Sequence, residues 1–281
     1  SFIVDKNDNL LVFGTTNSSN FPTEFGAPFP LKNGGMDLFV TKFNSAGSAL
    51  IGSTYIGGSE NDGLNQSSRT RYFYADDFRG EINLDTNGNV YVATCTRSND
   101  FTTTSGAFQP NTSLANSQEG VLFCLSPDLK TLKWSSYFGG NGDDAIYSVD
   151  VASNGDLYIS GGTTSTNLGA TSGSIGATYN GGRADGFVAR ISSDGRTLKR
   201  TGYWGTGEYD QVLSLDIDKY GNIFVVGHSD GGMPEKGNGY KNAGGSQFIS
   251  KFNPDLNSVL MSTVYGSGRK SPDITINAFL V

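Results

Sequence analysis

One sequence unit occurs four times along the chain, and this internal repeat constrains the fold more than any other feature. A stretch of 21 residues recurs with the same pattern, at 37–57, 119–139, 185–205 and, with one extra residue in its turn, 246–266. A second shared element precedes each copy, at 3–14, 82–93, 149–160 and 215–226. A repeat of about 66 residues indicates one supersecondary unit that buries its apolar face against its neighbours.

Each unit has the pattern of four strands. In the third copy, apolar and polar residues alternate over Val149–Ala152 and Asp156–Ser160, on either side of an Asn-Gly turn. A second pair, Gly186–Ile191 and Thr197–Trp204, flanks an Asp-Gly turn. No stretch has a helical period with caps. Four strands per unit, repeated radially, are typical of a β-propeller.

The predicted fold is therefore an all-β propeller with four four-stranded blades. The blades span approximately 1–60, 80–142, 145–207 and 211–268, with an inserted loop at 61–79. The chain ends Ala278–Val281 in a sequence like Ser1–Val4, so we expect 273–281 to be the first strand of a further blade. This predicts that 1–281 is a segment of a larger propeller. The alternative is that the extra strand closes the ring of four or swaps into it.

Composition excludes several classes of protein. The chain has 20 Lys and Arg against 27 Asp and Glu, a net charge of −7 with no basic run, so we predict no nucleic-acid partner. No apolar run approaches the length of a membrane span, so we predict no membrane insertion. With 39 Gly and 12% aromatic residues, the chain has the composition of apolar strands joined by tight turns rather than of a disordered chain.

Several motifs in a fixed order resemble the bacterial SBBP-type β-propeller repeat. They occur at Asp85–Val92, Phe21–Thr23, Phe101–Thr103, Gly106–Gln109, Asp37–Phe43 and Ser53–Gly58. Copies three and four depart from the pattern of Phe21–Thr23 and Phe101–Thr103 and from that of Gly106–Gln109. The ending Ser271–Val281 is similar to that of large secreted Bacteroidota proteins with a gliding-motility-associated sorting domain, which the type IX secretion system exports.

The resemblance implies a non-enzymatic module for binding or display, in adhesion or gliding, at the cell surface or in the extracellular medium. Its implied partners are other domains of the same polypeptide, the type IX machinery or an outer-membrane protein, and surface glycans. It supplies no catalytic residues, and the sequence has no catalytic motif beyond a lone His228 beside Ser229 and Asp230. The alternatives are a purely structural spacer, or a carbohydrate-active enzyme with its site on the face formed by the long loops.

The connection between copies one and two carries the candidate binding residues. It exceeds the other connections by about 17 residues and is rich in arginine and aromatic side chains, which are enriched at binding hot spots. The candidates for a partner or glycan contact are Arg69, Arg71, Tyr72, Phe73, Tyr74, Phe78 and Arg79. The alternative is that its aromatic residues only fix the insert to the blade.

Two oxygen-rich turns give a weak prediction of calcium, and no other cofactor is predicted. The residues are Asp5, Asn7, Asn9, Asp85, Asn87 and Asn89. The bidentate Glu of a calcium loop is absent, and Asn-Gly is also what a hairpin turn requires, so hairpin turns are favoured. Cys95 and Cys124 lie on neighbouring predicted strands and are a candidate disulfide, with buried free thiols as the alternative.

Overall fold

The computed structural model describes residues 1–281 except 72–76, 78, 243, 269–272, 274–275 and 277–278. The described residues form four antiparallel sheets of four strands, each ordered as the chain runs. Blade 1 contains β1 (Phe2–Val4), β2 (Leu10–Thr16), β3 (Asp37–Phe43) and β4 (Leu50–Ile56). Blade 2 contains β5 (Glu81–Leu84), β6 (Val90–Thr96), β7 (Glu119–Leu125) and β8 (Leu132–Phe138).

The third and fourth blades repeat this arrangement. Blade 3 contains β9 (Asp144–Val151), β10 (Leu157–Thr163), β11 (Asp185–Ile191) and β12 (Leu198–Trp204). Blade 4 contains β13 (Asp210–Ile217), β14 (Ile223–Ser229), β15 (Gln247–Phe252) and β16 (Val259–Tyr265). The first strand of blade 3 begins at Asp144 rather than at the predicted Val149, because Ala145 and Ile146 are already buried against neighbouring blades.

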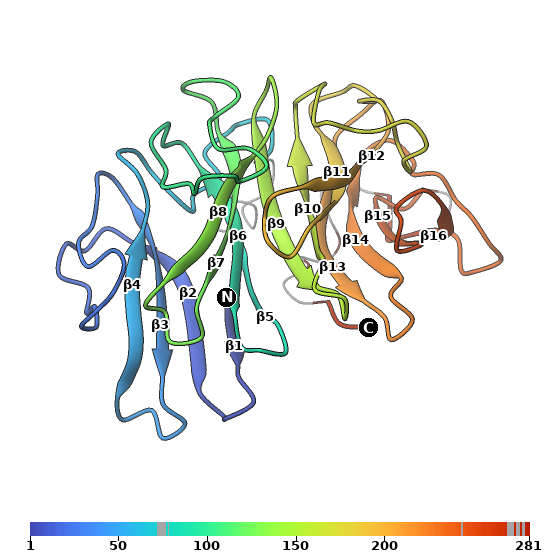
Figure 1. The fold of residues 1–281 in the computed structure, drawn as a ribbon. Helices are drawn as coiled ribbons and strands as arrows, with labels where there is room; N and C mark the ends of the chain where they lie inside the picture. Colours follow the sequence, from blue (N-terminus) through green and yellow to red (C-terminus); the bar gives the residue numbers. More distant parts are fainter. Residues whose placement is uncertain (72–76, 78, 243, 269–272, 274–275, 277–278) are drawn as a thin grey trace.

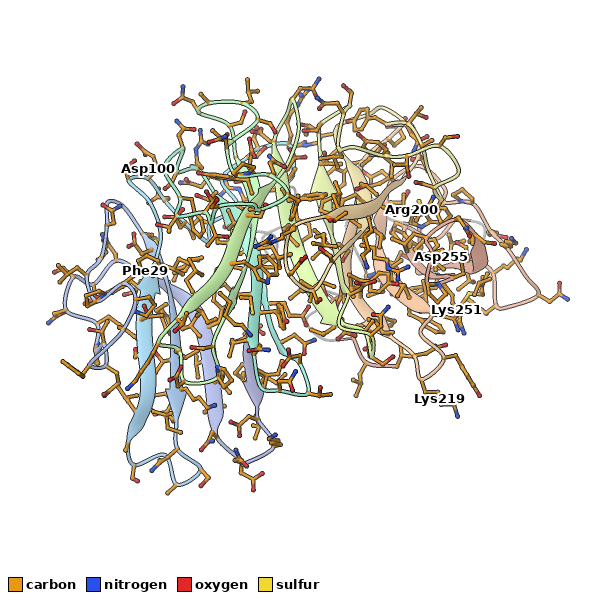
Figure 2. All side chains as sticks on the ribbon, viewed as in Figure 1. Phe29, Asp100, Arg200, Lys219, Lys251 and Asp255 are labelled. Carbon is orange, nitrogen blue, oxygen red and sulfur yellow. The ribbon has the colours of Figure 1, made fainter. Side chains whose placement is uncertain are left out.

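The blades follow one another around an axis, as Figure 1 shows from blue to red. The first strands β5, β9 and β13 contact one another in turn, and the second strands β2, β6 and β10 each contact the first strand of the next blade. The fold class is therefore as predicted, an all-β propeller segment of four blades. The long loops lie at one end of the blades and the short hairpins at the other; in Figure 2, Asp100 marks the loop end and Lys219 the hairpin end.

The apolar core lies between the blades. One buried cluster joins Val40 of blade 1 to Phe123 of blade 2. The rings of Phe138 and Phe187, 4.8 Å apart, belong to the cluster between blades 2 and 3. Burial of apolar sheet faces is the main stabilising contribution at such junctions, at roughly 25 cal/mol per Å². The long loops that follow the second strands therefore lie on a rigid support.

Each long loop covers the outer edge of its own fourth strand. In blade 2, Tyr137 N on β8 donates to Gln109 O at 3.0 Å, and Thr104 N donates back to Ser135 O at 3.1 Å. The Tyr137 hydroxyl accepts from Phe101 N at 2.9 Å and donates to Ser98 O at 2.8 Å. Tyr55 and Tyr203 make the same pair of bonds in blades 1 and 3. The loops thus satisfy an edge that would otherwise present open backbone groups.

A buried aspartate fixes each connection from one blade to the next. Asp144 accepts from Gly140 N at 2.8 Å and from Ser165 Oγ at 2.7 Å, and it also bonds Thr163. Asp62 has the same role between blades 1 and 2. Burial raises the pKa of both carboxyl groups to about 7, and a second carboxyl group nearby adds to the effect.

The end of the chain lies against blade 4. The described residues among 273–281 belong to no strand. Val281 N donates to Asp216 Oδ2 at 2.6 Å, as Ile217 N of β13 donates to Asp150 Oδ2 at 3.0 Å. Val281 therefore contacts blade 4 as β13 contacts blade 3. That 273–281 forms the first strand of a further blade remains a prediction.

Candidate binding site

The described part of the insert is anchored by buried polar contacts. Asn65 and Thr70 are buried and bond each other, and Gln118 and Tyr147 bond this pair from blades 2 and 3. These contacts join 65–70 to the loop end of the blades. The insert therefore bridges two blades through its backbone and amide groups.

The seven candidate binding residues of the insert are only partly described. Tyr72, Phe73, Tyr74 and Phe78 lie outside the described residues. Arg69 is exposed, and Arg71 Nε lies 3.3 Å from Asp77 Oδ1. The guanidinium carbon of Arg79 lies 5.8 Å from the centre of the Tyr147 ring, and its Nη1 donates to Ile276 O. Arg71 and Arg79 thus contact different parts of the molecule.

The oxygen-rich turns are hairpin turns. Asp5 Oδ1 accepts from Asn7 N at 2.8 Å and Asn9 N at 3.0 Å, and its Oδ2 lies 2.8 Å from Lys42 Nζ. Asp85 accepts from the backbone N–H groups of the corresponding Asn87 and Asn89.

These turns do not fit a calcium ion. At the first turn the Asp5 carboxylate is already paired with the Lys42 ammonium and with two backbone N–H groups. At the second turn, Lys133 Nζ donates to Asn89 Oδ1 at 2.8 Å, so one of the expected ligands already faces a cation. Among the described residues, no group of three acidic, histidine or cysteine side chains is placed to bind a metal.

The candidate disulfide is not formed, and the alternative of two buried free thiols holds. Cys95 is paired with Gly120 and Cys124 with Tyr91, so the two cysteines stand four residues apart along the paired strands. At about 3.3 Å per residue this separation is about 13 Å, beyond the reach of a disulfide. Both thiols are free and buried, and burial raises the pKa of each to about 12.

A pocket of about 520 Å³ opens between blades 2 and 3 at the hairpin end. Its wall combines carboxylate, amide, hydroxyl, ammonium, guanidinium and aromatic groups. The lining residues are Asp85, Asn87, Asn89, Tyr91, Thr104, Ser105, Gly106, Ala107, Cys124, Lys133, Trp134, Gly155, Ser193, Asp194 and Arg196. They come from three strands and three hairpins, together with part of the long loop of blade 2.

Local sequence explains the aromatic wall of this pocket. Trp134 is the first buried residue of β8, and its indole N–H donates to Ser193 O at 3.1 Å. Its ring lies over Gly195, where φ is +67° and an added Cβ would stand 2.3 Å from Trp134 Cδ2. Tyr91 lies 6.2 Å from the Trp134 ring, and its hydroxyl donates to Asp85 Oδ2 at 3.3 Å. The result is a carboxylate, a carbonyl and two rings around one cavity.

Four sequence candidates line this pocket, namely Asp85, Asn87, Asn89 and Cys124, but they were proposed for calcium and a disulfide. Sequence reasoning did not find a binding site here because it placed binding on the insert and the loop face. The pocket lies at the opposite end, and most of its residues belong to strands and short hairpins. A signal was nevertheless present in the aligned copies. The sixth position of the 21-residue stretch is Lys42, Arg190 and Lys251 in three copies but Cys124 in the second.

A second hollow, of about 410 Å³, lies beside blade 4. Ser229, Asp230, Met233 and Glu235 are among its lining residues. The single histidine, His228, is buried next to it, with Nε2 2.7 Å from Asp230 Oδ1. Ser229 Oγ accepts from Gly231 N. These contacts hold a loop in place and do not form a serine nucleophile paired with a histidine base.

The fold and the pocket define a β-propeller segment with a pocket at a blade junction. No protein-family model and no curated protein matches the chain. Within the described residues no helix is long and apolar enough to cross a membrane.

Several solved structures are similar to the chain, among them the following two. One is a protein of unknown function from Dyadobacter fermentans DSM 18053, with 13% identity and a TM-score of 0.46 over 94% of this chain and 63% of that chain. The other is the quinohemoprotein alcohol dehydrogenase ADHIIG from Pseudomonas putida HK5, with 13% identity and a TM-score of 0.42 over 90% of this chain and 36% of that chain. The chain thus spans less than two thirds of either protein.

Proposed function

We propose that this chain is a non-enzymatic binding module of a secreted or cell-surface protein. The observation that carries the proposal is the pocket between blades 2 and 3, where Asp85, Tyr91 and Trp134 surround a cavity of about 520 Å³. A concave site with aromatic walls and a few fixed polar groups is the usual form of a ligand site. Hydrogen bonds at the blade junction hold these three groups in place.

The wider setting follows from the motifs that resemble the SBBP-type repeat. Under this proposal the module belongs to a large polypeptide exported by the type IX system, and it serves in adhesion or gliding. Its partners are then neighbouring domains, the secretion machinery or an outer-membrane protein, and surface glycans. The insert, with exposed Arg69 and Arg71, is a second surface for such contacts.

A binding screen tests the proposal. The purified chain is applied to arrays of glycans and of short peptides, beside a Cys124→Arg variant that fills the pocket and an Arg69→Ala/Arg71→Ala variant of the insert. Binding that one of these variants loses supports the module and shows which surface carries it. Absence of any ligand across both arrays contradicts the proposal in favour of a structural spacer. Turnover of a polysaccharide by the purified chain contradicts the non-enzymatic assignment.

A further inference from the structure

Three of the four blades place a basic side chain at the same position of the third strand. In each of these blades the residue precedes the bulge between the third and fourth strands and contacts an aspartate of the first hairpin. Lys42 Nζ lies 2.8 Å from Asp5 Oδ2, and Lys251 Nζ lies 2.8 Å from Asp218 Oδ2. The cation is therefore a regular part of the repeat.

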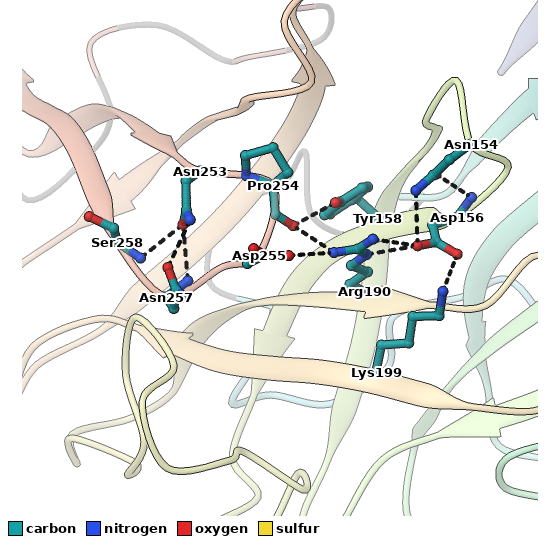
Figure 3. A network of polar contacts seen from close by, with 10 residues as sticks. All are labelled: Asn154, Asp156, Tyr158, Arg190, Lys199, Asn253, Pro254, Asp255, Asn257 and Ser258. Atoms are coloured by element: carbon teal, nitrogen blue, oxygen red, sulfur yellow. Dashed lines mark hydrogen bonds and ion pairs between the residues drawn. The ribbon is translucent and has the colours of Figure 1, made fainter.

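Blade 3 shows the full set of groups that receive this cation (Figure 3). Arg190 Nη2 lies 2.7 Å from Asp156 Oδ2, and Nη1 donates to Pro254 O of the next blade at 3.3 Å. The guanidinium carbon lies 5.7 Å from the centre of the Tyr158 ring, within the range of a cation–π contact. A carboxylate, a ring and a carbonyl of the next hairpin thus surround one positive charge.

Blade 2 has all three receiving groups, but Cys124 stands where the basic residue is expected. Asp85 stands at the turn position of Asp5 and Asp218, whereas in blade 3 the carboxylate comes from Asp156, four residues further along the turn. Tyr91 is paired directly opposite Cys124, and Ser193 O is the carbonyl of the next hairpin. Within the described part of the chain, no lysine or arginine nitrogen lies within 4.0 Å of the Asp85 carboxylate. The pocket of about 520 Å³ opens at this place.

Lys133 lines the pocket, and blade 3 shows that it leaves room for a further cation. Lys133 Nζ donates to Asn89 Oδ1 at 2.8 Å. Its counterpart, Lys199, lies 2.6 Å from Asp156 Oδ1, while Arg190 lies on the other oxygen of the same carboxylate. One turn carboxylate therefore receives two positive groups in the neighbouring blade.

Arg196 and Trp134 are also compatible with a cation in the pocket. Arg196 occupies the same position in the repeat as Lys130, which lies at the junction of blades 1 and 2. That junction also contains the basic residue Lys42, so a cation at the position of Arg196 does not exclude a second one. Trp134 donates one hydrogen bond to Ser193 O, and the corresponding carbonyl between blades 3 and 4 accepts two donors. Ser193 O thus retains a lone pair for a ligand.

We propose that this pocket binds an alkylguanidinium or alkylammonium cation, of the kind that ends an arginine or lysine side chain. The ligand takes the place that the repeat's own basic residue fills in the other blades, between Asp85, the Tyr91 ring and Ser193 O. The inference rests on the proposed binding function and names its ligand class. The net charge of −7 favours the approach of a cation.

Calorimetric titration of the full chain tests this assignment. The probes are ethylguanidinium, Nα-acetyl-arginine methylamide and, as a neutral isostere, Nα-acetyl-citrulline methylamide. We expect saturable binding of the arginine derivative and at least about tenfold weaker binding of the citrulline derivative, because the neutral urea group lacks the charge that strengthens a hydrogen bond to a carboxylate. Ethylguanidinium that binds as well as the arginine derivative indicates a free small cation; weaker binding indicates a peptide side chain.

Three variants separate the pocket from the rest of the surface. Cys124→Arg supplies the missing cation from the chain itself and should abolish binding. Cys124→Ser keeps the pocket open and should bind within about threefold of the wild type, and Asp85→Asn should weaken binding at least about tenfold because the carboxylate charge is lost. If Cys124→Arg fails to fold, the other two variants decide.

The inference is overturned if the wild type shows no saturable binding of either cation. It is also overturned if Cys124→Arg and Asp85→Asn bind as the wild type does, or if citrulline binds as well as arginine. If the titration fails but the arrays show a ligand that the Cys124→Arg variant still binds, the cation assignment is wrong and the proposed binding function is retained. Failure of the arrays and of the titration together contradicts both.

Discussion

At the scale of single residues, buried carboxyl groups at the blade junctions determine how stability responds to pH. Burial raises the pKa of Asp62, Asp144 and Asp185 to about 7. At the turns the shift is opposite: burial acts to raise the pKa of Asp5, but the bonds from Lys42 and the Asn9 amide lower it further than burial raises it. The two groups of carboxyls therefore act in different pH ranges.

The sign of the pH effect follows from linkage. An unfolded aspartate has a pKa of about 3.9, so between about pH 4 and 7 the folded chain keeps protons at its junctions that the unfolded chain has released. The junction carboxyls therefore favour folding most at low pH, and this contribution is lost as pH rises through about 7. Asp5 contributes in the opposite sense, with stability that is lost as pH falls below about 4.

We predict a melting temperature that is higher at pH 5 than at pH 8. A loss of about 1 kcal/mol at each of three junctions corresponds to a decrease of about 6–12 °C, at about 2–4 °C per kcal/mol. Differential scanning calorimetry measures the change. Asp144→Asn should flatten the dependence, because the amide stays neutral, whereas Asp8→Asn at an exposed turn should not. A melting temperature that rises from pH 5 to 8 contradicts the account.

At the scale of elements, the tyrosine of the fourth strand joins each long loop to its blade. We predict that Tyr137→Phe destabilises the protein by about 1–3 kcal/mol, because Phe101 N and Ser98 O both lose a buried partner. Urea unfolding measures the loss, and Tyr220→Phe at an exposed position is the control. Equal stabilities of the two variants would show that the loop is held by other contacts.

The strands were predictable from sequence, and the first strands were the least so. Alternation and Asn-Gly or Asp-Gly turns located the second, third and fourth strands of blade 3 within a residue or three. The start of β9 was missed because Ala145–Tyr147 is buried on both faces and therefore has no alternating pattern. The path of the long loops down the fourth strands has no periodic signal at all.

The candidate site was harder to predict than the fold. Cys95 and Cys124 lie on adjacent strands, as expected. Their separation of four residues along the strands follows from the register of β6 against β7, which the positions of the strands in the sequence do not determine. The pocket arises where Cys124 replaces the basic residue that the other three copies have at the same position. This replacement has a meaning only once the structure shows what the basic residues contact. The binding surface chosen from the length and composition of the connections was the insert instead.

At the scale of the whole molecule, the blades are equivalent in pairing a basic residue of the third strand with an aspartate of the first hairpin, except in blade 2, where Cys124 replaces the basic residue. We predict that Cys124→Arg raises the melting temperature by about 2–4 °C for each kcal/mol gained at this junction. The reason is that Asp85 acquires the intramolecular cation that Asp5, Asp156 and Asp218 already have. Thermal unfolding beside Cys124→Ser measures the gain, and a loss of stability in the arginine variant alone contradicts the equivalence.

The most direct test of the central claim is a crystal structure of the wild-type chain with Nα-acetyl-arginine methylamide. The account predicts the guanidinium in the pocket between blades 2 and 3, with a nitrogen about 2.7–2.9 Å from the Asp85 carboxylate and the plane near the Tyr91 ring. A guanidinium bound elsewhere, or a pocket that stays free of it at saturating concentration, would contradict the claim.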